Sequence, residues 1–445
     1  MKYRNVWLTG IVLALVPFAA IAQISLPRVG GGLPQIPDNG IYGNDQSISG
    51  PLVDPSTGVI NNNILDRLSA AELRTMLERL RIDRVKRFLR ENKNYVERDQ
   101  YGDPAVRGVL IATGISESSL QSATAEGFRI LERESIDGLG ISYVKLAVRP
   151  GRKLESEQKK LQKIAREADI SADNIYFPSG LDSANASLPI AIPPLNGLLL
   201  ASGNTPSGAM GLIDGGIARH DAINIAVEQR GFAKGAPSAS NHGTAIASLV
   251  SANPHRPRRL LAADIYGRDP AGGNATAIVQ ALGWMAQRQV PVVTISLVGP
   301  ENPLLGLAIS AAQKKGVLIV AAVGNDGPAA PPRFPASYKG VIGVTGVDRR
   351  ERALPEAGIR TPVDFAAPGA DLKGASPDGK IISLRGTSFA APLVAARLAV
   401  HYPSPDITRI RPSINALIRE AKDLGKKGPD KIFGNGLICG KCGLR

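Results

Sequence analysis

Four polar residues stand where apolar segments of the second half of the chain begin or end. Ser388 lies in GTSFAAP, between the strand-forming GKIISLR and a long apolar helical segment. His242 opens the apolar helix HGTAIASLVSA, Asp214 ends the strand in GLIDGGI, and Asn325 ends the strand VLIVAAVGN. Taken singly, each residue is an ordinary helix cap or turn residue. Pro392, which follows Ser388, is expected in the first helical turn, where a proline removes no intrahelical hydrogen bond.

Taken together, the four residues are chemically complete for acyl transfer. A serine hydroxyl is a weak nucleophile that needs an imidazole to accept its proton, and the imidazole needs a carboxylate to fix its tautomer. The oxyanion that forms needs donors, which an asparagine amide and the backbone N–H at a helix N-terminus supply. We therefore interpret Asp214, His242, Ser388 and Asn325 as one candidate site.

The elements that must position this site read as an α/β unit. From residue 209 onward, apolar strand-like runs such as VPVVTISLVG alternate with amphipathic helical segments such as TAIVQALGWMAQRQ. This alternation predicts a mainly parallel sheet with helices on both faces. Ligands of such sheets bind at the carboxyl ends of the strands, where the four residues are expected.

The sequence of the first half of the chain predicts an organisation different from that of the α/β unit. Residues 23–60 are rich in Gly, Pro, Asn and Ser and read as a flexible leader, and residues 61–105 as an Arg-rich helical segment that opens with a capping box at Ser69. Residues 106–178 read in the order βαββαβ, with a hairpin at residues 137–140, and residues 179–207 read as a Pro-broken linker.

The N-terminal residues and the amino-acid composition bear on the location of the protein and on the ligands it binds. Residues 1–22 have a basic start, an apolar run and a small-residue ending, as a secretory signal peptide does, although an uncleaved anchor stays open. We expect a secreted or periplasmic protein with no stable membrane insertion after signal cleavage. Despite a net charge of +14, the aromatic content of 4% does not favour nucleic-acid binding. Cys439 and Cys442 are expected to form a local disulfide.

The motifs LIDGGI, HGTAIAS, AAVGNDG and GTSFAAP together resemble those of the subtilisin-like serine proteases (subtilases, peptidase family S8), over residues 209–438. The resemblance implies a three-layer subtilisin-like α/β fold for a catalytic domain at 208–438, with residues 439–445 as a C-terminal tail. It implies serine endopeptidase activity through an acyl-enzyme, with protein or peptide substrates. It also implies the following site residues: catalytic Asp214, His242 and Ser388, oxyanion-hole Asn325, and substrate-binding Ser296, Leu297, Val298 and Gly299.

The same resemblance implies that residues 106–178 form a small α+β ferredoxin-like propeptide domain, which acts as intramolecular inhibitor and chaperone. Two positions depart from the family pattern. Ala245 stands where a second histidine is usual, and Val298 stands where a glycine is usual, which adds bulk beside a bound peptide. No cofactor is identified, and ligands for the structural calcium of many family members are not found. A catalytically silent subtilase-like binding scaffold, and an esterase with the same triad, stay as alternatives.

Overall fold

The computed structural model describes residues 68–179, 208–254 and 256–442. All of them belong to one compact unit that spans residues 50–445. The predicted signal peptide, the predicted leader and nearly all of the predicted linker lie outside the described residues.

The larger sheet has seven strands, and every neighbouring pair in it is parallel. Its order is β14-β13-β12-β10-β7-β9-β8, so the strands nearest the centre are among the most apolar of the chain. The strands are β7 (Ala209–Asp214), β8 (Ala226–Gly231), β9 (Arg259–Asp264), β10 (Val292–Ile295), β12 (Leu318–Ala322), β13 (Ile342–Val347) and β14 (Phe365–Pro368).

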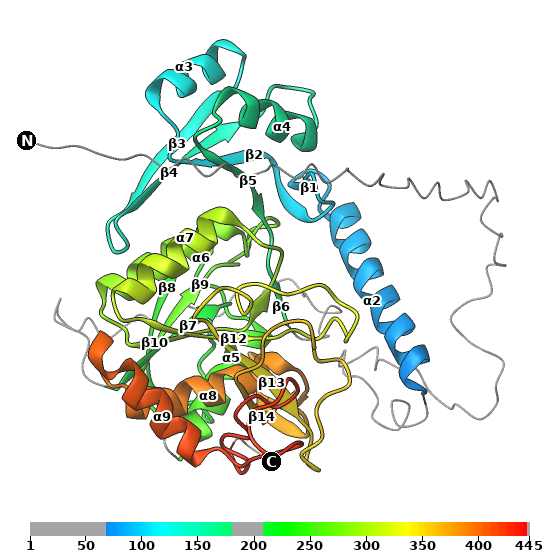
Figure 1. Cartoon of the computed structure of the whole chain (residues 1–445), viewed down its shortest axis with the longest axis vertical. Helices are drawn as coiled ribbons and strands as arrows, with labels where there is room; N and C mark the ends of the chain where they lie inside the picture. Colours follow the sequence, from blue (N-terminus) through cyan, green and yellow to red (C-terminus); the bar gives the residue numbers. More distant parts are fainter. Residues whose placement is uncertain (1–67, 180–207, 255, 443–445) are drawn as a thin grey trace, which may run out of the picture. The chain divides into compact units, whose positions relative to one another are not determined.

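Helices cover both faces of this sheet, which makes three layers (Figure 1). Successive residues of a strand face opposite sides, so Leu212 packs in the core with α5 (Asn241–Ala252) and α8 (Thr387–His401). Its neighbour Ile213 packs in the core with α6 (Ala275–Gln287) and α7 (Pro303–Lys314). The last helix, α9 (Ile410–Glu420), follows a short 3-10 turn (Ile407–Arg409) and packs against α8.

A smaller antiparallel sheet precedes the larger one in the chain. It contains β1 (Val96–Arg98), β2 (Pro104–Thr113), β3 (Arg129–Ile136), β4 (Ile141–Ala147) and β5 (Asp169–Asn174). Two helices, α3 (Glu117–Ala125) and α4 (Leu154–Ile164), lie on one of its faces (Figure 1). The other face contributes Ile111, Ile136 and Tyr143 to the core around α6 and α7. The element order β2-α3-β3-β4-α4-β5 is the predicted βαββαβ order.

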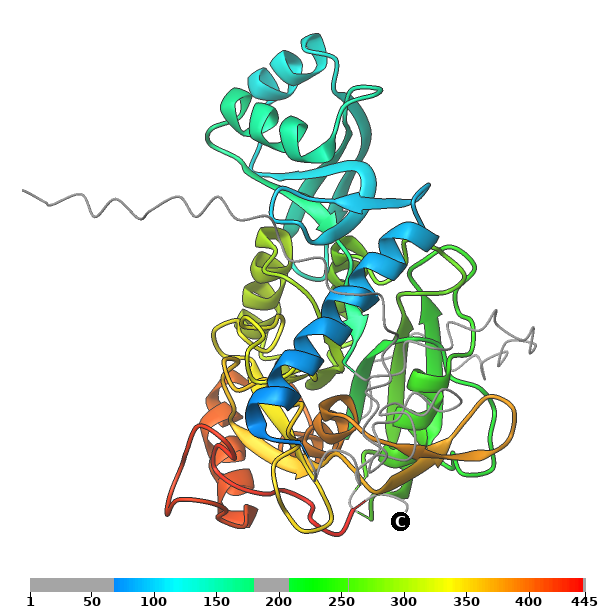
Figure 2. The ribbon, with the colours of Figure 1, turned by 90° about the vertical axis from the view of Figure 1, so that its right-hand side faces the viewer.

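One helix, two pairs of short strands and a disulfide complete the described chain. Helix α2 (Ala70–Glu91), the long blue helix of Figure 2, begins with the predicted capping box of Ser69 and Glu72. The two-residue strand β6 (Phe177–Pro178) pairs antiparallel with β11 (Leu297–Val298), and β15 (Leu372–Ala375) pairs with β16 (Ile381–Leu384). Cys439 and Cys442 form the predicted disulfide.

The structure corrects the sequence predictions at several points. Pro392 lies in the second turn of α8, because the helix already begins at Thr387. The segment GKIISLR holds a strand, but that strand belongs to the two-stranded sheet β15-β16 and not to the large sheet. Strands β8 and β14 were not predicted. Within the described residues, no helix has both the length and the apolar character needed to cross a bilayer.

Candidate active site

The four candidate residues stand at the carboxyl ends of strands or at the starts of helices, as predicted. Asp214 is the last residue of β7, and Asn325 lies three residues beyond the end of β12. His242 and Ser388 are the second residues of α5 and α8. Because β7 and β12 both flank β10 and run parallel to it, their carboxyl ends lie at the same edge of the sheet.

Asp214 and His242 form a buried pair. The Nδ1 atom of His242 lies 2.9 Å from each carboxylate oxygen of Asp214, and the two residues are 8% and 1% exposed, respectively. The backbone N–H of Gly215 also donates to this carboxylate, at 2.7 Å. Helix α5 can come this close because residue 243 is glycine: a Cβ there would lie 2.3 Å from the carbonyl oxygen of Gly215. The carboxylate is therefore positioned to hold the imidazole in one orientation.

The start of α8 lies beside this pair. The ring centroids of His242 and Phe389 are 5.2 Å apart, and Phe389 directly follows Ser388. Ser388 is fully buried, and its hydroxyl has no hydrogen-bond partner among the described residues. A buried hydroxyl without a partner is costly in a core and common at a functional site.

Asn325 is oriented toward the same place by the backbone of α8. Its Oδ1 atom accepts a hydrogen bond from the N–H of Thr387 at 3.0 Å, which leaves Nδ2 as a buried donor with no partner in the described chain. Gly386, at a φ of 144°, provides the space. A Cβ at Gly386 would lie 2.7 Å from Asn325 Nδ2 and 3.4 Å from Ser388 Oγ. The amide donor and the hydroxyl therefore converge on one point, which any residue other than glycine would fill.

A third group reaches this point from the first half of the chain. The carbonyl oxygen of Ser179 lies 3.2 Å from the same Cβ position at Gly386. Ser179 follows β6, and its N–H donates to the carbonyl of Ser296 at 3.1 Å. The predicted substrate-binding residues Ser296, Leu297 and Val298 thus pair with an extended segment of the chain itself, whereas Gly299 pairs with Phe334. A peptide carbonyl is thereby brought next to a hydroxyl and an amide donor.

Helix α2 is attached beside Asn325. Arg84 of α2 and Arg333 both contact the carboxylate of Asp326, each at 2.5 Å. Burial alone would raise the pKa of Asp326, but the guanidinium groups of Arg84, Arg333 and Arg81 together outweigh it and hold the pKa below its usual value. Leu77, which is 2% exposed, packs against Gly327, and Phe88 makes an edge-to-face contact with Phe177 of β6.

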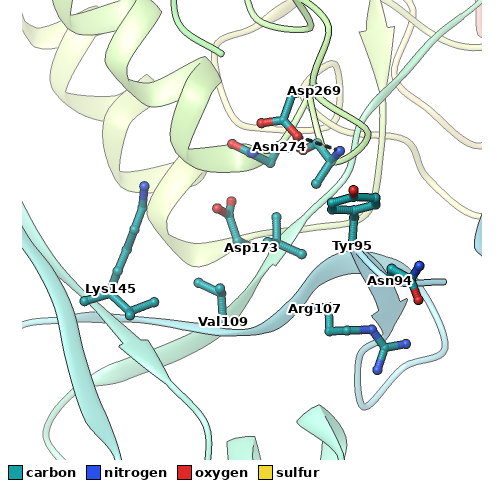
Figure 3. A pocket seen from close by; sticks show the side chains of 11 residues that line it. Asn94, Tyr95, Arg107, Val109, Lys145, Asp173, Asp269 and Asn274 are labelled. Carbon is teal, nitrogen blue, oxygen red and sulfur yellow. Dashed lines mark hydrogen bonds between the residues drawn. The ribbon is translucent and has the colours of Figure 1, made fainter. Parts of the chain in front are cut away.

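The smaller sheet is attached through buried polar contacts. Asp173 of β5 accepts hydrogen bonds from the N–H and the hydroxyl of Thr276 in the first turn of α6. Asn302, which caps α7, donates to the carbonyl of Ala172 and to Asn174. Burial raises the pKa of Asp173, although the ammonium group of Lys145 acts in the opposite direction. Both side chains line a cavity of about 530 Å³ between β2, β5 and the start of α6 (Figure 3).

Sequence reasoning missed several of these residues. Ser179 was expected in a linker, and the only signal that precedes it is the strand-like DNIYF. The contacts of Arg84 and Leu77 join residues more than 200 positions apart, so no local pattern predicts them. Within the described ranges, no group of three or more His, Cys, Asp or Glu side chains could hold a metal ion. The calcium expectation stays a prediction.

Comparisons with known proteins identify the family. Residues 210–436, about half of the chain, match the model of the subtilase family, peptidase S8. The chain is 30% identical to subtilisin BL of Lederbergia lenta over 262 residues, which cover 55% of this chain and 93% of that protein. It is 28% identical to the minor extracellular protease Epr of Bacillus subtilis over 241 residues, which cover 51% of this chain and 37% of Epr.

Among solved structures, the chain is similar to the prenylagaramide maturation protease PagA, with 24% identity and a TM-score of 0.44 over 53% of this chain and 92% of PagA. The match of residues 210–436 to the family model shows that the protein belongs to the subtilase family, and its α/β fold is the subtilisin-like one. The sequence prediction of a serine peptidase of family S8 is confirmed.

Proposed function

We propose that this protein is an exported serine endopeptidase that hydrolyses peptide bonds through an acyl-enzyme on Ser388. The observation that carries the proposal is the convergence at Gly386 of the Ser388 hydroxyl, the Asn325 amide and the carbonyl oxygen of Ser179. Nucleophile, oxyanion donor and peptide carbonyl are the groups that acyl transfer requires together.

In the proposed mechanism, Asp214 accepts the Nδ1–H of His242, which leaves Nε2 to act as the base. The hydroxyl proton of Ser388 moves to Nε2 while Oγ bonds to the carbonyl carbon of the substrate. The resulting oxyanion is stabilised by Asn325 Nδ2 and by a backbone N–H at the start of α8. The C–N bond then breaks, and His242 gives its proton to the departing amine. Water repeats the sequence on the ester, which releases the acid and restores Ser388.

The N-terminal half is, in this proposal, the protein's own inhibitor and folding aid. Strand β6 pairs antiparallel with β11 as an added strand, which is how an extended peptide binds a strand edge. Ser179 then occupies the position whose carbonyl is attacked, called P1. The bond between Ser179 and Gly180 is therefore the proposed maturation site, within the predicted linker. Residues up to Ser179, including α2, form the prosegment.

Purification of the full chain and of Ser388→Ala tests this function. We expect the unmutated chain to separate into two fragments, with a new N-terminus at Gly180 by mass spectrometry, and Ser388→Ala to stay whole. Ser413→Ala is the matched control, because Ser413 is also a buried serine but lies in α9, away from the site. This variant should separate into the same two fragments as the unmutated chain. Processing of purified Ser388→Ala at the same bond would refute self-cleavage.

Activity in trans separates a peptidase from a silent binding scaffold. A fluorophosphonate probe should label Ser388 in the mature protein, and the mature protein should digest an unstructured polypeptide. Turnover should fall by roughly a million-fold in Ser388→Ala, the size known for subtilisin itself. Probe labelling and digestion that persist in Ser388→Ala would refute the proposed site.

Export is proposed on two grounds. The first 22 residues have the pattern of a secretory signal peptide, and the relative Epr is named an extracellular protease. Fractionation of cells that produce the full chain should recover its mature form outside the cytoplasm. Recovery of the whole chain from the cytoplasm with an intact N-terminus would contradict export.

A further inference from the structure

We propose that Val298 restricts the P1 residue of substrates to small side chains such as Ser, Ala and Gly. The inference rests on the proposed function, because it takes the carbonyl of Ser179 as the one that Ser388 attacks. It assigns a specificity to this chain at a position where its sequence departs from the family pattern.

The P1 residue lies between two segments of the chain, the β11 segment and the loop that follows β12, which form the two walls of its site. On one side, both the N–H and the hydroxyl of Ser179 donate to the carbonyl of Ser296, the residue directly before β11. On the other side, the carbonyl oxygen of Ser179 lies near the Asn325 amide, in the loop that follows β12. Ser179 is 1% exposed, so a larger side chain at this position must find its space inside the protein.

The space between the walls is already filled. A Cβ at Gly324, the residue before Asn325, would lie 3.3 Å from Cγ1 of Val298 and 3.4 Å from Cγ of Arg333. The valine side chain on β11 therefore reaches the backbone of the opposite wall. Valine is stiff about χ1, and Arg333 is held by its ion pair with Asp326, so neither group yields easily.

A glycine at position 298 would leave this volume open. With valine present, a Leu or Phe at P1 has to displace Val298 or Arg333 from a packed position, which overpacks the site. Serine avoids the conflict because its hydroxyl is satisfied by the adjacent carbonyl of Ser296. The residue that the chain itself places at P1 is thus of the size that the walls admit.

The cleft accepts a large residue three positions earlier. The ring of Tyr176 lies over Gly299, where a Cβ would come within 2.5 Å of the ring, and its hydroxyl donates to the carbonyl of Pro300 at 2.8 Å. Tyr176 is fully buried. The test peptides therefore keep this tyrosine three positions before the P1 residue.

Peptide p-nitroanilides of sequence Tyr-Phe-Pro-Xaa, with Ser, Ala, Leu or Phe as Xaa, test the proposal on the mature protein. We expect kcat/KM for Ala and Ser to exceed that for Phe by roughly 100-fold, within the range that pocket size commonly gives. Val298→Gly should raise the ratio of kcat/KM for Phe to kcat/KM for Ala by about 10-fold or more. Val298→Thr keeps the branched shape and is the matched control, which should retain the preference. Equal kcat/KM for Ala and Phe, or an unchanged ratio in Val298→Gly, would overturn the proposal.

A second measurement does not depend on activity. In the full-length Ser388→Ala background, Ser179→Phe should lower the melting temperature more than Ser179→Ala does. Adding Val298→Gly should lessen the cost of Ser179→Phe, after the effect of Val298→Gly alone is subtracted in a double-mutant cycle. If the protein cleaves nothing, the proposed function fails, and this cycle still decides the role of Val298. Equal melting temperatures for Ser179→Phe and Ser179→Ala would contradict it.

Discussion

Helix α2 should detach from the rest of the protein when its contacts with the loop after Asn325 are weakened. Leu77 is the main apolar contact, because it is nearly fully buried and packs against Gly327. Arg84 is the main polar contact, through Asp326. Both positions can be changed without touching any of the proposed catalytic residues.

The size of the effect follows from burial. Replacing a buried leucine by alanine typically costs about 2–5 kcal/mol. If α2 opens while the rest of the chain stays folded, the whole cost lowers the free energy of that opening, and 2 kcal/mol corresponds to about 30-fold. Arg84→Ala should cost less than the 3–5 kcal/mol or so of a fully broken buried pair, because Arg333 still neutralises Asp326.

Hydrogen exchange on full-length Ser388→Ala, which cannot cleave itself in our proposal, measures this opening. The amides of α2 should exchange at least about 30-fold faster in Leu77→Ala, with little change in the larger sheet. Arg87→Ala, at an exposed position of the same helix, is the control and should leave exchange unchanged. Unchanged exchange of α2 in Leu77→Ala would show that the packing of Leu77 does not hold the helix.

Three further predictions concern the site, the docking of the smaller sheet and the core. Asn325→Ala should lower kcat about 100- to 1,000-fold with little change in KM, as for this type of donor in subtilisin; a loss confined to KM in p-nitroanilide kinetics would contradict the oxyanion role. Because burial raises the pKa of Asp173, this carboxyl group holds its proton more tightly when the smaller sheet is docked on the catalytic domain than when it is free. Docking should therefore weaken as pH rises through that raised pKa. Co-elution of the cleaved prosegment with the mature protein, followed against pH, measures this, and Asp173→Asn should remove the dependence; an unchanged pH dependence in that variant would assign it to another group. Arg385→Met leaves the fully buried carboxylate of Glu356 without its bidentate partner. The free energy of unfolding, measured by chemical denaturation, should fall by about 3–5 kcal/mol. An unchanged free energy of unfolding would contradict this prediction.

Sequence patterns predicted the parts of the fold that depend on local periodicity and end signals. The apolar strands β7, β10 and β12 and the capping box of Ser69 fall where they were expected. Strand β8 was missed because its sequence, AVEQRG, is polar and lies at the sheet edge, where one face needs no apolar residues. Strand β14, FAAP, is short and ends in proline, which reads as a breaker.

The candidate site was predictable in its residue types but not in its full geometry. Asp214, His242 and Ser388 carry chemical signals, and glycines beside them mark close backbone approaches. The placement of Ser179 beside Gly386 has no local signal, because a two-residue strand is defined only by its partner about 120 residues away. The same is true of Arg84, whose partner Asp326 is 242 residues away.

The three attachments of the N-terminal half have a consequence for the order of events after cleavage. Cutting the chain after Ser179 would change its connectivity and leave the contacts of α2, β5 and β6 in place. Three linked sites bind as a multivalent ligand, because each bound site keeps the other two at high local concentration. Loss of any single contact would then be reversed before the fragment could leave. Release would require a second cut between attachments, and residues 92–95, which join α2 to β1, are the connection that would convert one tight ligand into two weaker ones.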